Sequence, residues 1–317
     1  MNRASGEIAF VVNPHAAVGA VGKEWPRIEK RSRERLGSFR TYITRGPGDA
    51  THLTRNALGE GCEIIVCVGG DGTFNEVING FMEGEGTVHP NAAVGYIARG
   101  TGCDFIKTVP LPKDLEKALD IIEKGQRVSM DLGRIEYKDN GGQTAYRYFH
   151  NVASFGLGGE VDERVNRTTK VFGGFFSFIW ATLVSVLLYN RKHIRLTMDN
   201  GFDKMVTVLN VAVANGQYHG GGMWVSPEAR VNDGEFHVTV IGDFSLPEVL
   251  WHLPKLYNGK LMGLQKVSSF TATRVEARSE ERVLLDLDGE QPGRLPVTVE
   301  MVPGALKLIA DGPLSPS

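Results

Sequence analysis

The sequence has few cysteines and no marked excess of charge of either sign. Its 317 residues include three cysteines, Cys62, Cys67 and Cys103, which form neither a CxxC pair nor a ligand cluster. Such a count fits a reducing compartment better than a disulfide scaffold or a zinc site. The net charge is −2, so the chain does not have the excess of basic residues that is typical of a nucleic-acid-binding protein. We therefore expect a cytoplasmic protein with no nucleic-acid partner.

Export signals, internal repeats and low-complexity linkers are also missing, and one long apolar run stands out. Ile8–Val12 is too short for a signal-peptide core, and Asn-Pro follows it. Val171–Tyr189 carries no charge and reaches the length of about 18 residues at which a membrane span is considered. It contains Gly, Ser and Thr and lies between strand-like segments, so we expect a buried or interface-facing helix rather than a span.

The ends of this apolar run are basic, which leaves two roles open. A helix of this kind can dock at an anionic membrane surface, or it can pack inside a domain with solvated charges at its ends. The aromatic residues of the run would touch lipid in the first case and the core in the second. The flanking basic residues are Arg164, Arg167, Lys170, Arg191, Lys192, His193 and Arg195.

The first part of the chain alternates strand-like and helix-like segments. Continuous β-branched runs such as Ile64–Val68 are typical of buried parallel strands. The alternation predicts a parallel sheet with helices on both faces, an α/β domain over residues 1–128. The expected strands are Ile8–Val12, Phe39–Thr44, Ile64–Val68 and Ala93–Ala98, and the expected helices include Gly22–Arg35, Asp49–Leu58, Thr73–Met82 and Leu115–Lys124.

Strand-like segments dominate from about residue 129, so a second, β-rich domain with an antiparallel sheet or sandwich is expected over residues 129–311. Its last strand could pack back on the first domain, and residues 312–317 would form a loose tail. The expected strands are Tyr146–Ser154, Val206–Ala214, Glu235–Ile241, Phe270–Ala277, Val283–Leu287, Val297–Val302 and Leu306–Ile309, with a helix over Leu246–Tyr257.

The strongest chemical signal is the segment Gly69-Gly70-Asp71-Gly72-Thr73-Phe74-Asn75-Glu76. It follows an expected buried strand and opens an expected helix. Its glycines let the backbone approach a ligand, and the free N–H groups at a helix start attract phosphate. Thr73 and Glu76 have the spacing of a capping box. The segment is neither a Walker A loop nor a G-x-G-x-x-G fingerprint, and a plain strand–helix turn would need fewer glycines.

Two more Gly-containing turns follow expected strands. One begins at Asn13-Pro14 after the first strand, and the other contains Gly100-Thr101-Gly102 after the fourth. Loops at the carboxyl ends of parallel strands share one crevice, where ligands bind. We therefore expect the three loops to converge on one nucleotide.

These pieces together resemble the diacylglycerol kinase catalytic-domain family, in particular bacterial diacylglycerol and sphingosine-kinase-like lipid kinases. The matching pieces occur in the family's order from about Phe10 to Ile309, whereas GGDGT alone is shared with NAD kinases. The resemblance implies the two-domain architecture of NAD kinases and diacylglycerol kinases. The pieces are NPHAAVGAVG, GGDGTFNEVING, ARGTGCDF, MDLGR, NVASFGLGGEV, VANGQYHGGGMWVSPEARVNDGEF and LDLDGE.

The resemblance implies an ATP-dependent, Mg²⁺-dependent lipid kinase that transfers the γ-phosphate to a lipid hydroxyl, with diacylglycerol as the expected acceptor and phosphatidic acid as the product. Asp288-Gly289-Glu290 is similar to the family's catalytic D-G-E, which makes Glu290 the base, with Asp71 and Asp288 as further catalytic residues. The implied ATP-binding residues are Asn13, Thr44, Gly69, Gly70, Asp71, Gly72, Thr73, Phe74, Asn75, Gly100 and Thr101.

A structural magnesium site is also implied by the resemblance. Asp233 would give its carboxylate, and Arg230 and Glu235 would give backbone carbonyls. Asp131 would be linked to the metal through these ligands without binding it directly. Oxygen donors of this kind suit Mg²⁺. On the residues alone, Asp-Gly between apolar strands indicates a hairpin turn at 288–289, and Asn232-Asp233-Gly234 indicates another turn. A turn and a metal site do not exclude one another.

The chain departs from the family pattern at the Gly-Thr turn, where Ala98 and Cys103 replace the usual Pro and Asn. Cys103 is expected to be a small filler rather than a reactive thiol.

Two other functions stay open. An NAD kinase would show a Gly-Ser-Thr-Ala-Tyr segment, which is missing, and a silent membrane-associated binding protein would be favoured by loss of Asp71 or Glu290, which are both present. We expect peripheral contact with the inner face of the membrane, and a homodimer is the default oligomer.

Overall fold

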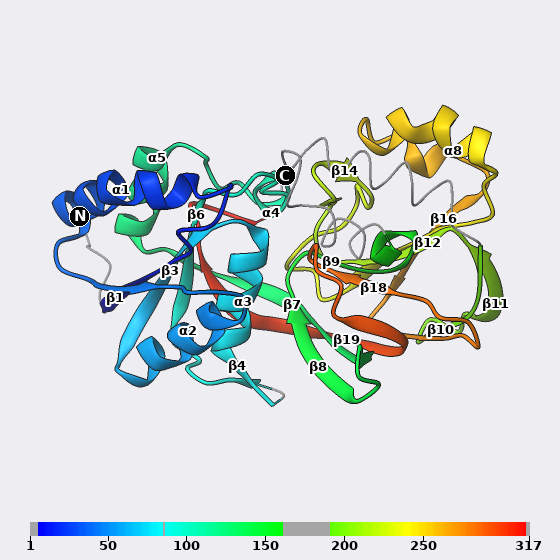
Figure 1. The fold of residues 1–317 in the computed structure, drawn as a ribbon, viewed down its shortest axis with the longest axis horizontal. Helices are drawn as coiled ribbons and strands as arrows, with labels where there is room; N and C mark the ends of the chain where they lie inside the picture. The colour runs from blue at the N-terminus through cyan, green and yellow to red at the C-terminus, as the bar shows by residue number, and fades with distance from the viewer. Residues whose placement is uncertain (1–5, 85, 161–190, 315–317) are drawn as a thin grey trace. The chain divides into compact units, whose positions relative to one another are not determined.

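The computed structural model describes residues 6–84, 86–160 and 191–314 and divides the chain into two compact units (Figure 1). The first unit comprises Met1–Leu132, Val231–Asp233 and Pro303–Ser317. The second comprises Gly133–Arg230 and Gly234–Val302. Strands β7 (Arg127–Asp139) and β19 (Gly293–Ile309) each contribute residues to both units. The expected helix over Val171–Tyr189 lies outside the described residues.

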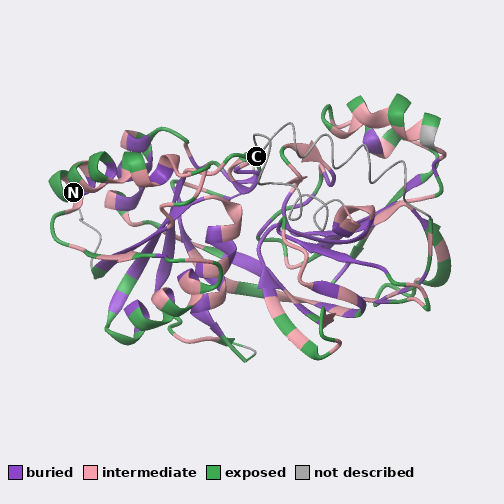
Figure 2. Cartoon of the chain, in the orientation of Figure 1, coloured by how far each residue is buried: buried purple, intermediate pink, exposed green. Residues whose placement is uncertain are grey.

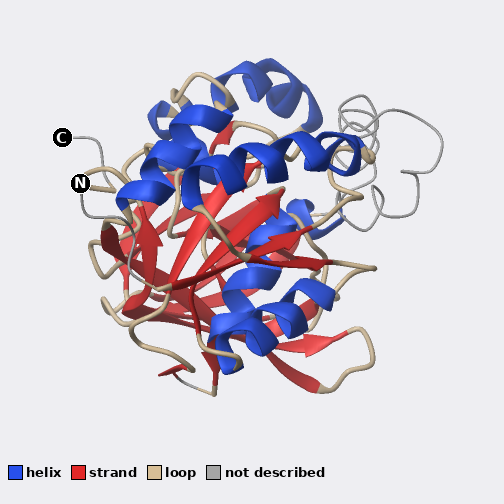
Figure 3. Ribbon diagram, turned by 90° about the vertical axis from the view of Figure 1, so that its left-hand side faces the viewer, coloured by secondary structure: helices blue, strands red, loops and turns tan. Residues whose placement is uncertain are grey.

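The first unit is built on a parallel sheet with the strand order β19-β6-β3-β1-β2. Helices α1 and α5 pack together on one face, and α2 and α3 pack together on the other (Figure 3). The expected α/β domain is confirmed. Its elements are β1 (Glu7–Val12), α1 (Ala20–Leu36), β2 (Arg40–Ile43), α2 (Asp49–Gly59), β3 (Cys62–Gly69), α3 (Asp71–Phe81), β4 (Met82–Glu83), β5 (Gly86–Thr87), β6 (Ala93–Ala98), α4 (Phe105–Thr108) and α5 (Leu115–Lys124).

Two antiparallel layers of strands form most of the second unit, and β13 and β14 pair separately. One layer contains β8, β7, β19, β17, β10 and β11, and the other has the order β16-β15-β12-β9-β18. The expected β-rich domain is thereby confirmed. Its remaining elements are β8 (Thr144–Phe149), β9 (Val152–Gly156), β10 (Lys192–Met198), β11 (Asp203–Val208), β12 (Asn210–Ala214), β13 (Tyr218–His219), β14 (Met223–Trp224), β15 (Phe236–Ile241), α8 (Leu246–His252), η1 (Leu253–Leu256), η2 (Leu261–Gly263), β16 (Val267–Ala272), β17 (Arg274–Arg278) and β18 (Leu285–Leu287).

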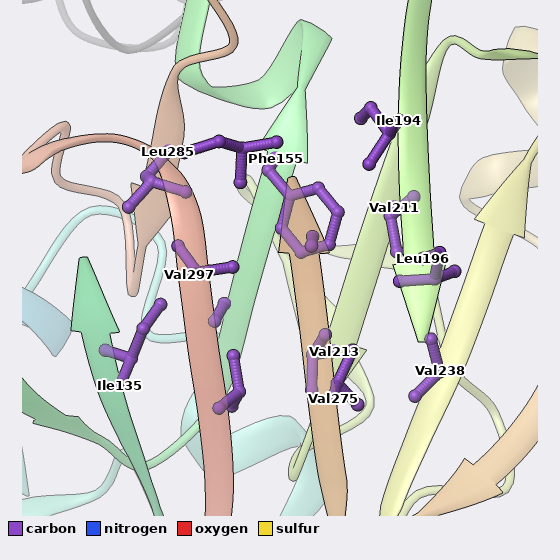
Figure 4. Close-up of a cluster of buried hydrophobic side chains, with 14 of the residues drawn as sticks. Ile135, Phe155, Ile194, Leu196, Val211, Val213, Val238, Val275, Leu285 and Val297 are labelled. Carbon is purple, nitrogen blue, oxygen red and sulfur yellow. The ribbon is translucent and has the colours of Figure 1, made fainter. Parts of the chain in front are cut away.

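The core of the second unit lies between its two sheets. Alternate residues of each strand point inward, because successive side chains of a strand face opposite sides. Figure 4 shows Ile194 and Val275 from one sheet beside Phe155 and Val211 from the other. These buried side chains form one cluster. The outward residues of β10, β11 and β17 are exposed or half-buried, whereas those of β9, β12 and β15 are buried as well (Figure 2). This apolar contact makes the second unit a sandwich and fixes the strands that carry its polar residues.

Candidate active site

The register of the parallel sheet brings the three Gly-containing loops to one edge. Val12 pairs with Ile43 of β2 and Val68 of β3, and Gly69 pairs with Ala98 of β6. The residues that follow continue the ladder, since the N–H of Asn13 donates to the Val68 carbonyl at 3.0 Å and that of Thr44 donates to Val12 at 2.9 Å. The predicted nucleotide residues of these loops therefore lie side by side in the first unit.

The loop after β3 leaves the start of α3 available to an anion. The helix begins at Asp71 after an extended Gly70, and within the described part of the chain no side chain caps it. The first N–H groups of such a helix and its dipole attract phosphate. The predicted capping box is wrong, because Thr73 lies inside the first turn and the Glu76 carboxylate accepts the N–H groups of Gly48 and Ala50 at 2.8 and 3.1 Å.

Gly70 and Gly100 hold two of these loops in backbone contact. A Cβ added at Gly100 would lie 2.5 Å from the Cα of Gly70, and one added at Gly70 would lie 3.1 Å from the Cα of Gly100. The N–H of Arg99 also donates to the Gly69 carbonyl at 2.6 Å. No side chain fits between these backbones, so glycine is required for the close approach. Thr101 is exposed at the tip of the second loop.

Several side chains that were predicted to bind a nucleotide hold the loops in position. The Asn13 amide donates to the Thr73 hydroxyl at 2.9 Å, which links the first loop to α3. Thr44, Phe74 and Asn75 are buried, and the Phe74 ring stacks on Tyr96 at 4.3 Å. Within the Gly69–Asn75 loop, backbone groups rather than these buried side chains are what an incoming phosphate would meet.

Asp71 links the Gly69–Asn75 loop to the segment after β6. Its carboxylate accepts the N–H of Asp104 at 3.0 Å and that of Phe105 at 3.4 Å. The carboxylates of Asp71 and Asp104 both lie within 4 Å of the point where a Cβ of Gly102 would stand. Two carboxylates beside a loop that offers N–H groups suit Mg²⁺, which uses one or two of them together with nucleotide phosphates and water, although Asp104 also pairs with Lys107 at 2.6 Å. Across the described ranges, no group of three or more His, Cys, Asp or Glu residues could hold a metal without a nucleotide.

Cys103 closes the turn at the position where the family usually has Asn. Its thiol accepts the Gly100 N–H at 3.1 Å and donates to the Gly100 carbonyl at 3.3 Å. The residue is buried and has a φ of 47°, a conformation in which Asn is enriched. Burial raises the pKa of the Cys103 thiol. The thiol thus supplies the turn contact that an amide could make and is held in its unreactive, protonated form.

The expected D-G-E segment is a tight hairpin in the second unit. Leu287 and Glu290 exchange backbone hydrogen bonds of 2.8 and 3.1 Å, and Asp288 and Gly289 between them have φ values of 50° and 87°. Positive φ at both central residues is the mark of a type I′ turn, which explains the Asp-Gly pair. Glu290 leaves this hairpin with 41% of its side chain exposed and pairs with Arg147 at 2.7 Å.

Asp288 points into the interior and anchors the hairpin. Its carboxylate accepts the N–H groups of His150, Asn151 and Val152 at 3.0, 3.1 and 2.9 Å and lies 2.7 Å from His150 Nδ1. Burial alone would raise the pKa of Asp288, but the charge and hydrogen bonds of His150 and the N–H of Val152 hold it down to about 2. These contacts favour a positioning role for Asp288 and leave Glu290 as the accessible carboxylate.

Asp286 is a further buried carboxylate that the sequence analysis did not single out. It forms a short contact with His219 Nε2, accepts the Ser154 hydroxyl at 3.4 Å and accepts the N–H of Gly289 at 3.0 Å. The alternation Leu285-Asp286-Leu287-Asp288 is the signal that could have found Asp286, because it places both carboxylates on one side of the strand.

The predicted structural metal site is a turn whose base carries Asp131. Arg230, Asp233 and Glu235 are exposed, and the N–H of Asp131 donates to the Val231 carbonyl at 2.7 Å. The Asp131 carboxylate accepts the N–H of Gly304 at 2.6 Å. The structure thus brings Asp131 to the base of this turn, and the metal assignment stays a prediction.

Comparison with protein families finds two matches, one in the N-terminal and one in the C-terminal part of the chain. Residues 7–135 match the diacylglycerol kinase catalytic domain, and residues 151–310 match the YegS C-terminal NAD kinase beta sandwich-like domain. The first match covers all three loops described above, and the second covers the D-G-E hairpin.

Relatives and solved structures agree with these two matches. The chain is 32% identical to a diacylglycerol kinase of Staphylococcus carnosus over 80% of this chain and 79% of the relative. It is 29% identical to one of Mycobacterium tuberculosis over 96% and 95%. A crystal structure of a diacylglycerol kinase from Bacillus anthracis covers 96% of this chain and 97% of its own, with a TM-score of 0.70 at 20% identity, and supports the fold. The chain therefore belongs to the diacylglycerol kinase family of lipid kinases.

Proposed function

We propose that this chain transfers the γ-phosphate of ATP to the hydroxyl of a lipid alcohol, with diacylglycerol as the acceptor and phosphatidic acid as the product. The observation that carries the proposal is Glu290, an accessible carboxylate on a rigid hairpin in a chain of this family. It occurs together with an uncapped helix start behind a Gly-rich loop, which suits nucleotide phosphate.

The nucleotide is proposed to bind on the first unit. Backbone N–H groups from Gly70 to Thr73 would face its phosphates, and the Gly70–Gly100 contact keeps the two loops close enough to share them. Asp71 and Asp104 would hold Mg²⁺, which supplies charge neutralisation for the phosphates when bound. Asn13 and Thr73 maintain the loop geometry through their hydrogen bond.

The lipid hydroxyl is proposed to meet Glu290. Phosphoryl transfer passes through a loose transition state and depends on positioning more than on a strong base. An ionised carboxylate held by Arg147 can orient the hydroxyl and accept its proton at Oε as the oxygen–phosphorus bond forms. Asp288 and Asp286 hold the hairpin in place through hydrogen bonds with the backbone N–H groups of Asn151 and Gly289.

NAD is the second acceptor to consider, since the C-terminal match describes an NAD kinase-like sandwich. The test offers γ-labelled ATP and Mg²⁺ with separate acceptors in mixed micelles, namely diacylglycerol, ceramide, a sphingoid base, monoacylglycerol, a polyprenol and free NAD. We expect label on diacylglycerol. Label on NAD alone would move the activity to the neighbouring kinase class, and label on another lipid would keep the lipid kinase and change its substrate.

A third possibility is a silent binding protein of the same fold. It predicts ATP binding by calorimetry without label on any acceptor. Retention of Asp71 and Glu290 argues against it, because a protein without catalysis has no need to hold an accessible carboxylate on so constrained a turn.

A further inference from the structure

A group of large apolar side chains is exposed around α8 in the second unit. Trp251 is 80% exposed, and Leu250 and Tyr257 are each 46% exposed. We call these three residues the α8 face. In Figure 1, α8 and the segment after it lie at the edge of this unit, and Figure 2 colours much of their outer side as exposed. Single exposed apolar residues are ordinary, but an aromatic group within one short segment indicates a contact surface.

The same segment has a separate core of its own, so the exposure of the α8 face is not the result of loose packing. Phe244, Leu261 and Val267 are buried beneath the segment, and Val249 and Leu256 pack against them. Ser245 and Glu248 form a capping box at the start of α8. The fold therefore holds one side of this segment firmly and presents Leu250, Trp251 and Tyr257 on the other.

The charge of this segment is positive. Lys255 and Lys260 flank Tyr257, and neither forms an ion pair with any residue that the structure describes. Glu248 is the only acidic residue between Leu246 and Lys266, and Lys266 neutralises it at 2.8 Å. Exposed Trp and Tyr beside unpaired lysines match the chemistry of an anionic bilayer surface, where aromatic rings lie among headgroups and lysines meet phosphates.

The α8 face also connects to the D-G-E hairpin within the same unit. A Cβ at Gly259 would lie 2.6 Å from the ring of Trp224, so this loop packs directly on β14. Trp224 stacks on Tyr218 of β13 at 5.3 Å, and the next residue, His219, contacts Asp286 beneath the hairpin. A bilayer bound at the α8 face would therefore contact a segment that packs against the part of the unit carrying Glu290.

We propose that the α8 face, together with Lys255 and Lys260, docks this chain on the surface of an anionic phospholipid bilayer. The inference rests on the proposed function to the extent that a bilayer is the source of the lipid acceptor. The surface differs from Val171–Tyr189, which lies outside the described residues.

The test measures binding to vesicles that contain phosphatidylglycerol and to vesicles of phosphatidylcholine alone, by cosedimentation and by tryptophan fluorescence. The intact chain is expected to prefer the anionic vesicles. Trp251→Ala should weaken this binding about tenfold or more, because a large apolar side chain that becomes buried in the bilayer contributes at least that factor to the binding constant. Lys255→Gln with Lys260→Gln should remove most of the preference for anionic lipid. Met205→Ala, at an equally apolar and 65% exposed position on β11, is the matched control and should bind like the parent.

Two results would overturn the proposal. One is vesicle binding that stays the same in Trp251→Ala and in the double lysine variant. The other is a dimer of the parent that Trp251→Ala dissociates in sedimentation experiments without any change in vesicle binding, since a second copy would then cover the α8 face.

Kinase assays separate this inference from the proposed function. A short-chain diacylglycerol, dispersed as monomers, should be phosphorylated equally by the parent and by Trp251→Ala, whereas diacylglycerol in anionic vesicles should be phosphorylated more slowly by the variant. Equal rates on vesicles would contradict the docking surface and leave the kinase intact. If the parent phosphorylates no lipid but Trp251→Ala still loses vesicle binding, the docking surface is supported and the kinase function is contradicted.

Discussion

Glu290 and Glu300 are two carboxylates of the second unit with similar exposure and similar partners. Glu290 pairs with Arg147 with 41% of its side chain exposed, and Glu300 pairs with Arg134 and Arg274 with 38% exposed. We expect Glu290→Gln to lower kcat by about 10²–10⁴-fold, the usual effect of losing a positioned base. Stability should change little, because an exposed ion pair contributes at most about 1 kcal/mol.

Glu300→Gln is the control for this change. It removes a carboxylate of the same exposure from the same unit and should keep the parent kcat. An equal loss of kcat in both variants, measured by initial rates of lipid phosphorylation, would argue that Glu290 acts only through surface charge.

The buried carboxylate of Asp288 predicts a pH-dependent stability. Its pKa is about 2 in the folded chain, below the value of about 3.9 in an unfolded chain. The group therefore stabilises the fold above pH 4, and this contribution is lost as the pH falls toward 2. Asp288→Asn should lower the free energy of unfolding by about 2–3 kcal/mol at pH 7 and by about half of that at pH 3.

Urea unfolding at pH 7, 4 and 3 checks this expectation. A difference between parent and Asp288→Asn that stays constant over this range would show that the charge of Asp288 contributes nothing and that only its shape matters.

Residue identity alone predicted part of this site. Asp-Gly before Glu290 indicated a turn, and the turn has the expected type. The partners His150 and His219 could not be predicted, because each meets its carboxylate across more than 60 residues of sequence. No local spacing records such a contact.

At the scale of elements, the contact between two loops gives a sharp test. Gly100→Ala would place a Cβ 2.5 Å from the Cα of Gly70, so one loop must shift. We expect the dissociation constant for ATP to rise about tenfold, which corresponds to about 1.4 kcal/mol. Gly59→Ala, at the end of α2 with no atom within 4 Å of the new Cβ, is the control.

Calorimetric titration with ATP and Mg²⁺ measures this effect. Unchanged affinity in Gly100→Ala would place the phosphates away from the Gly70–Gly100 contact.

Continuous apolar runs predicted the parallel strands well, because strands buried on both faces need apolar residues at every position. Antiparallel elements were harder. The expected strand Tyr146–Ser154 is divided into β8 and β9, because the N–H groups of His150 and Asn151 bind Asp288 instead of a neighbouring strand. The expected strand Val206–Ala214 is divided in the same way, since β11 and β12 belong to different sheets.

The ends of the helices could be predicted from neighbouring residues in the sequence only in part. The expected helix Leu246–Tyr257 is an α-helix to His252 and a 3₁₀ turn from Leu253, as Pro254 cannot continue an α-helix. The start of α3 was placed at Thr73 by its spacing to Glu76, but Glu76 serves the neighbouring α2. A tertiary partner thus overrode a local capping signal.

At the scale of the whole molecule, the three thiols report on opening of the first unit, which contains them all. Cys62, Cys67 and Cys103 are buried, and burial raises the pKa of each thiol. We expect iodoacetamide at pH 8 to label the folded chain slowly and the urea-unfolded chain at once. Fast labelling of Cys103 in the folded chain, located by peptide mass, would contradict the closed turn at Gly100.

No helix among the described residues is long and apolar enough to cross a membrane. The oligomeric state, the cytoplasmic location and the limits of the loose tail stay predictions of the sequence.

We propose that the Gly69–Asn75 loop binds ATP and that Glu290 activates a lipid hydroxyl. The most direct measurement is the initial rate of labelled phosphatidic acid formation from γ-labelled ATP and diacylglycerol, with ATP varied, for the parent, Gly100→Ala and Glu290→Gln. We expect a raised KM for ATP in Gly100→Ala and a lowered kcat with unchanged KM for ATP in Glu290→Gln. The absence of labelled lipid with a folded parent that binds ATP, or a parental kcat in Glu290→Gln, would contradict these roles.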